Sequence, residues 1–282
     1  MTNRILACPF QSALSALITT RVATICTMDA MRHSRLCQIG IALVLLGAVS
    51  HAVAQDATPP AARFYKGREI AQTMHYEGAA WLTRESRQRE EDCETLLAAL
   101  NVKPGDTVCD MGCGNGFYSL ELAKLVGEKG KVLAVDIQRE MLQMLKERAA
   151  DEEIANIELI HGTIVDPKLP ENSVDLMLMV DVYHEFSHPE EMLVAIRKSL
   201  KPIGRVALVE FRAEDPKVPI KPLHKMSKEQ IMKEFPPNGF KLVEEFDELP
   251  WQHLMFFMRD DAVERKRSGE GETRREGEVQ SR

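Results

Sequence analysis

Short apolar runs rich in β-branched residues alternate with longer segments of helical spacing across the middle of the chain. This alternation predicts parallel strands joined by crossover helices, because a tight turn cannot connect two parallel strands. It constrains the fold more than any other feature, since it sets both the strand direction and the layering. The runs cover residues 107–111, 131–135, 157–160, 174–180 and 205–211, and helices are predicted over residues 118–125, 139–150 and 189–200.

The C-terminal part of this region has a different rhythm. A helix is predicted over residues 227–235, after which Pro236 and Gly239 break the chain. Apolar runs at residues 240–249 and 252–258 follow close together, which favours an antiparallel pair at a sheet edge. We therefore predict an α/β fold, a Rossmann-like, doubly wound, mostly parallel seven-stranded sheet with an antiparallel edge pair.

Local signals mark the starts of two of these helices. Ser187 stands three residues before Glu190, and Ser227 stands three residues before Gln230, which is the spacing of a capping box. His188, beside a proline, is interpreted as a helix-start residue.

The length of 282 residues, 44% of them hydrophobic, is enough for one catalytic-sized domain with extensions. Residues 1–54 are predicted to be a leader that combines an over-long start with a signal peptide or anchor. A flexible linker is expected over residues 55–62 and a helical N-terminal cover over residues 63–100. The main domain covers residues 101–258, and residues 259–282 form a charged tail predicted to be disordered.

The leader has the features of an export signal. Arg32 and Arg35 precede an apolar run at residues 39–49, and the small-x-small triplet at residues 52–54 offers a cleavage site before Gln55. The run is shorter than the roughly 20 residues that a membrane-spanning helix needs. We expect an exported protein, periplasmic or anchored by an uncleaved leader, with membrane contact only through the leader; without export it would be cytoplasmic.

Charge and cysteine content exclude other classes of site. The net charge is −7 and no basic stripe with interleaved aromatic residues occurs, which disfavours a nucleic-acid partner. Cys93, Cys109 and Cys113 follow the leader, an odd number without a disulfide framework. No second Cys or His pair at zinc spacing follows Cys109 and Cys113, so no metal site is predicted.

The glycine-rich run VCDMGCGNGFYSL follows the first predicted strand and opens the first crossover helix. Open α/β sheets bind ligands at this place. Gly112 and Gly114 permit a tight turn and a close approach of the ligand to the backbone. A dinucleotide fingerprint needs its third glycine at position 117, where this chain has Phe117; the third glycine is Gly116. The spacing therefore weakens the case for a nicotinamide-dependent reductase.

The motif Asp-x-Gly-x-Gly-x-Gly that begins at Asp110 resembles the first motif of class I S-adenosylmethionine-dependent methyltransferases. The similarity covers about residues 85–258, and the run DVYHEFSHPEEML is similar to a group of predicted methyltransferases of unknown acceptor. The resemblance implies S-adenosylmethionine as the cofactor and a methyltransferase domain over residues 101–258. It also implies that Asp110 fixes the turn or the amino group of the ligand. The methionine part would be cradled by the backbone of Gly112, Cys113, Gly114 and Gly116.

Two later motifs are assigned to the adenosine part of the cofactor. Asp136 ends the second strand, where a carboxylate can accept both ribose hydroxyls; the alternative is a solvated strand-end aspartate. By the resemblance, Ile137 would flank the adenine ring. Family members often carry an aspartate where this chain has Thr163, so the adenine amino group would meet Thr163, or else Asp166 or backbone groups.

The run MVDVYHEFSHP ends the fourth strand, beside the expected position of the methyl group. Methyl transfer is an in-line displacement, so alignment of the acceptor is its main requirement. His184 is the candidate general base, because its unperturbed pKa is about 6.5, and Glu185 or Asp181 is able to orient it. Asp181 is also predicted to bind the cofactor. Alternatively, His184 caps the following helix or bonds a loop carbonyl.

The loop after the fifth strand carries several basic residues. They could cover the pocket of an anionic acceptor, but we favour the alternative that the loop is solvated. They are Arg212, Lys217, Lys221, His224 and Lys225. The predicted function is transfer of a methyl group from S-adenosylmethionine to an unidentified small molecule. The alternatives are a non-catalytic adenosyl-ligand binding module and a nicotinamide-dependent reductase. S-adenosylmethionine is made in the cytosol, so an exported enzyme would need a supply of this cofactor outside the cytosol.

Overall fold

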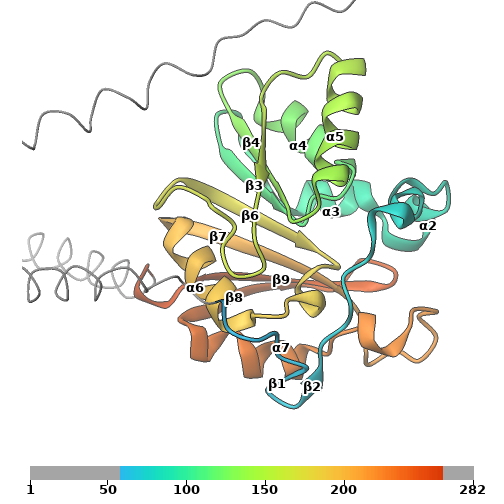
Figure 1. The fold of residues 1–282 in the computed structure, drawn as a ribbon, viewed down its shortest axis with the longest axis vertical. Helices are drawn as coiled ribbons and strands as arrows, with labels where there is room; N and C mark the ends of the chain where they lie inside the picture. Colours follow the sequence, from blue (N-terminus) through green and yellow to red (C-terminus); the bar gives the residue numbers. More distant parts are fainter. Residues whose placement is uncertain (1–57, 263–282) are drawn as a thin grey trace, which may run out of the picture. The chain divides into compact units, whose positions relative to one another are not determined.

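The computed structural model describes residues 58–262, and a seven-stranded sheet forms their centre (Figure 1). Its strands are β3 (Thr107–Met111), β4 (Lys131–Asp136), β5 (Ile157–His161), β6 (Val174–Val180), β7 (Leu200–Phe211), β8 (Phe240–Phe246) and β9 (Gln252–Arg259). They lie in the order β5-β4-β3-β6-β7-β9-β8. The first five in this order are parallel, and β9 runs antiparallel to both of its neighbours. The predicted fold class is confirmed.

Helices cover both faces of the sheet, because successive residues of a strand point to opposite sides. Val108 of β3 belongs to the core cluster under α3 (Cys93–Ala99) and α4 (Phe117–Val126). The next residue, Cys109, belongs to the cluster under α6 (Pro189–Ser199) and α7 (Lys228–Glu234). The remaining elements are the hairpin β1 (Phe64–Tyr65) and β2 (Arg68–Glu69), the helices α2 (Arg87–Glu91) and α5 (Arg139–Asp151), and the 3-10 helices η1 (Tyr76–Thr83), η2 (Tyr183–Glu185), η3 (Pro222–His224) and η4 (Pro236–Asn238).

The strand order reverses at β3, which has β4 on one side and β6 on the other. Since these three strands are parallel, their carboxyl ends meet at one edge of the sheet. Ligands of open α/β sheets bind in the crevice at such a switch point. The glycine turn after β3, Asp136 at the end of β4 and residues 181–185 after β6 therefore share one edge.

Strand bounds agree with the sequence except where pairing is irregular. β3 and β6 have the predicted bounds, whereas β7 begins at Leu200, not at residue 205. Leu200 pairs with Val174 ahead of a register shift, so the strand starts before a Lys-Pro-Ile-Gly stretch that hides it in the sequence. β8 ends at Phe246 rather than at residue 249.

One of the two predicted helix caps is formed. The Ser227 side chain accepts a hydrogen bond from the Gln230 amide at 3.1 Å and caps α7. The other prediction was wrong, because His188 occupies the N-cap position of α6 and the Ser187 hydroxyl bonds the His188 ring at 2.9 Å. His188 is thus a helix-start residue, as expected.

The N-terminal cover is helical only from Tyr76 onward, which corrects the expectation for residues 63–100. The hairpin at residues 64–69 has two-residue strands, which are too short to give a periodic signal. The linker prediction also changes in its described part: Ala62 donates its amide to the Ser187 carbonyl at 3.0 Å, and the His188 ring bonds the Pro59 carbonyl at 2.6 Å. The chain is thus fastened to the start of α6.

Several predictions fall on residues that the structure does not describe. The leader at residues 1–54, the first three residues of the linker and the tail from residue 263 lie outside the described residues. Arg259, expected to begin the tail, instead ends β9 and donates to the Leu200 carbonyl at 3.2 Å. Within residues 58–262 no helix has the length and apolar character needed to cross a bilayer.

Candidate functional site

A cavity of about 640 Å³ lies at the carboxyl edge of β3, β4 and β6. Small-molecule sites in proteins are commonly about 300–1,000 Å³, so the cavity can hold a ligand of that class. The strand ends form one part of its lining, and residues from two other segments complete it. These segments supply Gln72, Thr73, Met74, Trp81 and Leu82 before the sheet, and Pro219, Ile220, Lys221 and His224 after β7.

The glycine turn after β3 lines the cavity with bare backbone. Gly112 has a φ of +70°, and a Cβ built on it would lie 2.4 Å from Cγ2 of Val182. Gly114 has a φ of +53°, and its Cβ would lie 2.5 Å from Cδ1 of Leu82. Both positions favour glycine because the backbone is left-handed, and at Gly112 a methyl group would also collide with the β-branched Val182.

Asp136 is hydrogen-bonded to this turn. Its Oδ2 accepts from the Gly114 amide at 2.9 Å, and its Oδ1 accepts from the Gln138 amide at 2.8 Å. Burial raises the pKa of Asp136, although both amide bonds favour the charged form. The aspartate is thus a fixed acceptor in the cavity wall, not a solvated strand end.

The two residues predicted near adenine also line the cavity. Ile137 follows Asp136 and its carbonyl bonds the His161 ring at 3.0 Å. Thr163 lines the cavity, but its hydroxyl accepts from the Asp166 amide at 3.0 Å, so the side chain closes a local turn. The neighbouring Asp166, held open as an alternative, does not line the cavity.

Three residues predicted to contact the cofactor do not line the cavity. Asp110 is buried in β3, where it accepts a hydrogen bond from the Ser119 hydroxyl at 2.6 Å, and burial raises its pKa to about 6. Cys113 packs its side chain into the core with Leu120, and Gly116 is the N-cap residue of α4. The bond between Asp110 and Ser119 connects β3 to α4 across the turn, which agrees with one of the two roles expected for Asp110, and cofactor contact at these three residues stays a prediction.

Asp181, directly after β6, lines the cavity with a left-handed backbone at φ +51°. Its Oδ2 accepts from the Gln252 side chain at 2.7 Å, while Oδ1 is buried and has no hydrogen-bond partner in the described part of the chain. Burial raises the pKa of Asp181 well above its usual range. An unpaired buried oxygen on a cavity-lining residue is a ready acceptor for a ligand donor.

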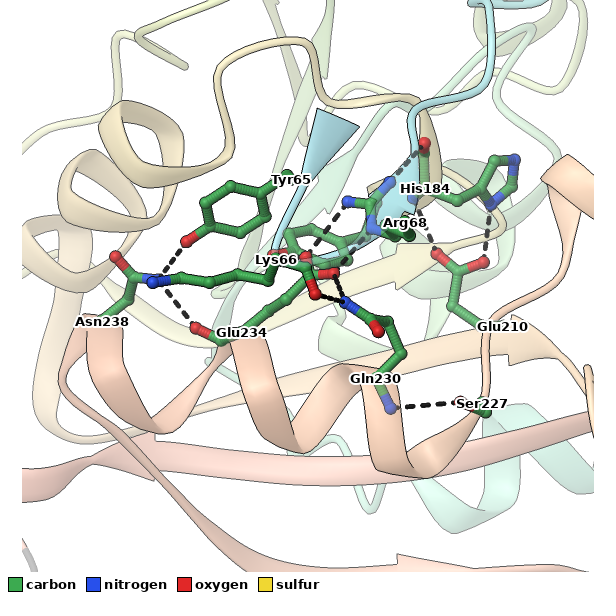
Figure 2. A network of polar contacts seen from close by, with 10 residues as sticks. Tyr65, Lys66, Arg68, His184, Glu210, Ser227, Gln230, Glu234 and Asn238 are labelled. Atoms are coloured by element: carbon green, nitrogen blue, oxygen red, sulfur yellow. Dashed lines mark hydrogen bonds and ion pairs between the residues drawn. The ribbon is translucent and has the colours of Figure 1, made fainter. Parts of the chain in front are cut away.

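His184 lies in η2 and is held by Glu210 of β7. Figure 2 shows both Glu210 oxygens facing it: Oε2 is 2.6 Å from ring Nδ1, and Oε1 accepts from the backbone amide at 3.2 Å. Burial lowers the pKa of His184, but the charge and hydrogen bond of Glu210 outweigh burial and the net shift is upward. The predicted orienting groups, Glu185 and Asp181, are thus replaced by Glu210.

The backbone of His184 is fastened to the N-terminal hairpin. Arg68 of β2 donates to the His184 carbonyl at 3.0 Å and pairs with Glu234 of α7 at 2.7 Å (Figure 2). Glu234 is fully buried and also accepts from the Tyr183 hydroxyl at 2.7 Å. Three separate segments therefore fix the position of the histidine.

Glu185 and His224 lie beside Nε2 of the His184 imidazole. His184 Nε2 is 3.1 Å from Nδ1 of His224 and 4.0 Å from Oε1 of Glu185. Burial raises the pKa of Glu185 to about 7, although the neighbouring His184 lowers it. Burial and the nearby His184 lower the pKa of His224. All three residues line the cavity.

Sequence reasoning missed three charged or ionisable residues of the site. Glu210 interrupts the apolar run VALVEF, and a carboxylate in a buried strand signals a partner. His224 was placed in a solvated loop, which is wrong because it is half-buried and bonds His184. Arg87 is a buried cavity residue paired with Glu91 at 2.8 Å, and no motif marks it.

A family model described as a methyltransferase domain matches residues 102–258. The chain belongs to this family. The match begins just before β3 and ends within β9, so it covers the whole sheet. The predicted resemblance to class I S-adenosylmethionine-dependent methyltransferases is thereby confirmed.

Curated relatives share part of this methyltransferase domain. A demethylmenaquinone methyltransferase of Oceanobacillus iheyensis is 31% identical over 114 residues, which are 40% of this chain and 48% of the relative. One of Listeria monocytogenes is 28% identical over 123 residues, 44% of this chain and 51% of the relative. The chain thus spans about half the length of the curated relatives it matches.

Solved structures also resemble about two thirds of this chain. A SAM dependent methyltransferase from Aquifex aeolicus is 28% identical with a TM-score of 0.63, covering 66% of this chain and all of that chain. A Pyrococcus horikoshii protein, 20% identical with a TM-score of 0.53, covers 62% of this chain and 92% of its own and shares the fold.

Proposed function

We propose that this protein transfers a methyl group from S-adenosylmethionine to a small-molecule acceptor. The proposal depends on one observation: two sets of residues line the same cavity. One set is the glycine turn with Asp136, and the other is His184 with Glu185. The first set suits an adenosyl ligand, and the second supplies groups that can act on an acceptor. Family membership supports the same chemistry.

The cofactor would bind along the strand ends. Asp136 would accept the ribose hydroxyls, and the bare backbone at Gly112 and Gly114 would let the methionine part approach closely. Ile137 and Thr163 would border the adenine ring. The unpaired Oδ1 of Asp181 would accept from a donor on the cofactor.

The acceptor would lie beside His184 and Glu185. The transfer is an in-line displacement at carbon, so holding the acceptor in line contributes most of the acceleration. With Nδ1 bonded to the Glu210 carboxylate, Nε2 of His184 carries the lone pair that faces the cavity. We assign the activation of the acceptor to this side of the cavity, around His184 and Glu185.

The acceptor class follows from charge and from the cavity wall. The net charge of −7 disfavours a nucleic-acid acceptor, and Phe186, Phe211 and Ile220 add apolar walls to the cavity. A small molecule with an apolar body fits these walls. The demethylmenaquinone methyltransferase names of the curated relatives make quinone-type rings the first acceptors to assay.

Calorimetry with S-adenosylmethionine, followed by an assay for S-adenosylhomocysteine release against a panel of quinols and phenols, tests the proposal. We expect binding that Asp136→Ala abolishes, while Asp106→Ala, in the loop before β3, leaves it unchanged. Binding without turnover on any acceptor would instead favour a non-catalytic adenosyl-binding module. Absence of cofactor binding would overturn both.

A further inference from the structure

We propose that His184, Glu185 and His224 form a binding site for one divalent transition-metal ion at the acceptor side of the cavity. The two histidines come from different elements: His184 lies in η2 after β6, and His224 ends η3 after β7. One ligand atom from each of the three residues lies within 4.8 Å of the others. All three side chains line the same cavity.

The separations of the ligand atoms suit a metal with small rearrangement. Bonds of about 2.0–2.1 Å in a tetrahedral site place ligand atoms about 3.4 Å apart. The two imidazole nitrogens are 3.1 Å apart, and His184 Nε2 is 4.0 Å from Oε1 of Glu185. To close the site, the Glu185 carboxylate would move toward the two imidazoles and away from the Met74 amide, from which its Oε1 accepts a hydrogen bond at 3.1 Å.

The surroundings of His184 are those of a metal-binding imidazole. Metal-bound histidines generally donate the other ring N–H to a carboxylate or carbonyl, which fixes the tautomer and the ring orientation. Oε2 of Glu210 accepts a hydrogen bond from Nδ1 of His184 at 2.6 Å (Figure 2). Glu210 is fully buried. The Arg68 side chain and the Ala71 amide hold the His184 carbonyl at 3.0 and 3.1 Å. The lone pair of Nε2 is therefore held toward the cavity.

The donor set indicates the class of ion. Two imidazoles and one carboxylate suit Zn²⁺, Fe²⁺, Co²⁺ or Mn²⁺ better than Ca²⁺ or Mg²⁺, which prefer oxygen ligands. Three protein ligands leave at least one position open to the cavity, as in catalytic sites and unlike closed structural sites. Cysteine spacing gave no sign of this site, because its ligands are histidine and glutamate from separate segments.

The role of the ion rests on the proposed function and narrows its substrate class to acceptors with an ionisable O–H. A cation that binds the acceptor oxygen lowers the pKa of its hydroxyl, so the proton leaves to water. The oxygen then forms a bond to the methyl carbon as the carbon–sulfur bond of the sulfonium breaks, and that electron pair stays on sulfur as the neutral thioether. Charge and atoms balance without an oxidant or reductant.

Binding of Zn²⁺ and Co²⁺ to the full-length protein, stripped with EDTA, tests the site directly. We expect about one equivalent to bind by calorimetry, and Co²⁺ to give the visible d–d bands of nitrogen and oxygen ligation without a thiolate charge-transfer band. His224→Ala and Glu185→Gln should each weaken binding at least tenfold. Glu210→Gln, which changes only the orienting carboxylate, should weaken it 10–100-fold. The matched control His75→Ala, at an exposed histidine, should leave the affinity unchanged.

Two results would overturn the metal site: Zn²⁺ affinity equal in wild type and His224→Ala, or a thiolate band in the Co²⁺ spectrum that persists in that variant. Calorimetry with S-adenosylmethionine on the same EDTA-treated samples separates this proposal from the proposed function. If the cofactor still binds when one of these two results is found, only the metal-site proposal is wrong. Loss of cofactor binding in the wild type removes the methyltransferase proposal, whereas metal binding stands on its own measurement.

Discussion

At the scale of single residues, burial decides the ionisation of the site's carboxylates. Asp110, Asp136 and Asp181 all have pKa values raised by burial, although each accepts at least one hydrogen bond. A buried carboxylate that cannot find an ion-pair partner costs free energy when it is charged. The site therefore carries a stability cost at neutral pH that a cofactor with hydroxyl and ammonium donors would offset.

Asp110→Asn should remove part of this cost. Burial raises the pKa of Asp110 to about 6, above an unfolded value of about 3.9. The native state thus binds the proton more tightly, so the stabilisation is fully present below about pH 4 and is lost as the pH rises through about 6. We expect the free energy of unfolding of wild type, relative to Asp110→Asn, to fall between pH 4 and pH 7 in urea denaturation. A difference that is constant with pH would contradict this. Ser119→Ala, which removes the hydrogen bond that lowers this pKa, should extend the fall to higher pH.

Gly112→Ala should lower both stability and cofactor affinity. A left-handed alanine costs about 1–2 kcal/mol, and here the methyl group would also meet Val182 at 2.4 Å. Gly105→Ala is the matched control, because Gly105 has a φ of +93° but no atom within 4 Å of its Cβ position. We expect chemical denaturation to show a larger loss for Gly112→Ala, and calorimetry to show weaker binding for that variant alone. Equal losses in the two variants would mean that the turn is not crowded.

At the scale of elements, the N-terminal hairpin is attached to α7 by a buried ion pair. Arg68 of β2 has a side chain 11% exposed, and its partner Glu234 is fully buried. The same guanidinium holds the His184 carbonyl, so one side chain connects the hairpin, α7 and the site (Figure 2).

Arg68→Met should therefore destabilise the fold by about 3–5 kcal/mol, because it leaves a buried carboxylate without its cation. Arg63→Met, which removes an exposed pair with Glu69, should cost less than about 1 kcal/mol. Urea denaturation of both variants makes the comparison. The double variant Arg68→Met with Glu234→Gln should recover part of the loss; similar effects of the two single variants would show that burial does not govern this pair.

Elements with a strong period could be predicted from the sequence, and elements held by distant partners could not. The apolar runs at β3 and β6 gave the correct strands, because both strands lie in the middle of the sheet. The hairpin at residues 64–69 depends on Arg68 reaching Glu234, which is 166 positions away. In the site, the place of Asp136 and His184 at the carboxyl edge of the sheet could be predicted, because Asp136 ends β4 and His184 follows β6 by a few residues. Glu210 and His224 could not be placed until the fold had brought β7 beside β6.

At the scale of the whole molecule, a ligand that binds only the folded state stabilises it by mass action. S-adenosylmethionine at about 100 times its dissociation constant should add about 2.7 kcal/mol to the free energy of unfolding. We expect a higher Tm that depends on cofactor concentration in wild type and not in Asp136→Ala. An equal rise in both would place the ligand outside the described cavity.

The leader at residues 1–54 gives a second prediction at this scale, from sequence alone. If the apolar run at residues 39–49 is a cleaved signal, N-terminal sequencing of the mature protein should begin at Gln55. A mature chain that retains this run and fractionates with membranes would support the uncleaved anchor instead. A retained run in the soluble cytosolic fraction would contradict export.

Some residues that line the cavity lie inside the part of the chain matched by the family model, and others lie before it. The strand ends lie inside residues 102–258, the part matched by the family model, whereas Gln72, Met74 and Trp81 lie before it. Met74 also donates its amide to Glu185 at 3.1 Å, so this outer wall reaches the acceptor side. Proteins that share the domain can therefore share a cofactor and still differ in what they methylate. Exchanging residues 58–83 between such proteins is the most direct way to transplant acceptor preference.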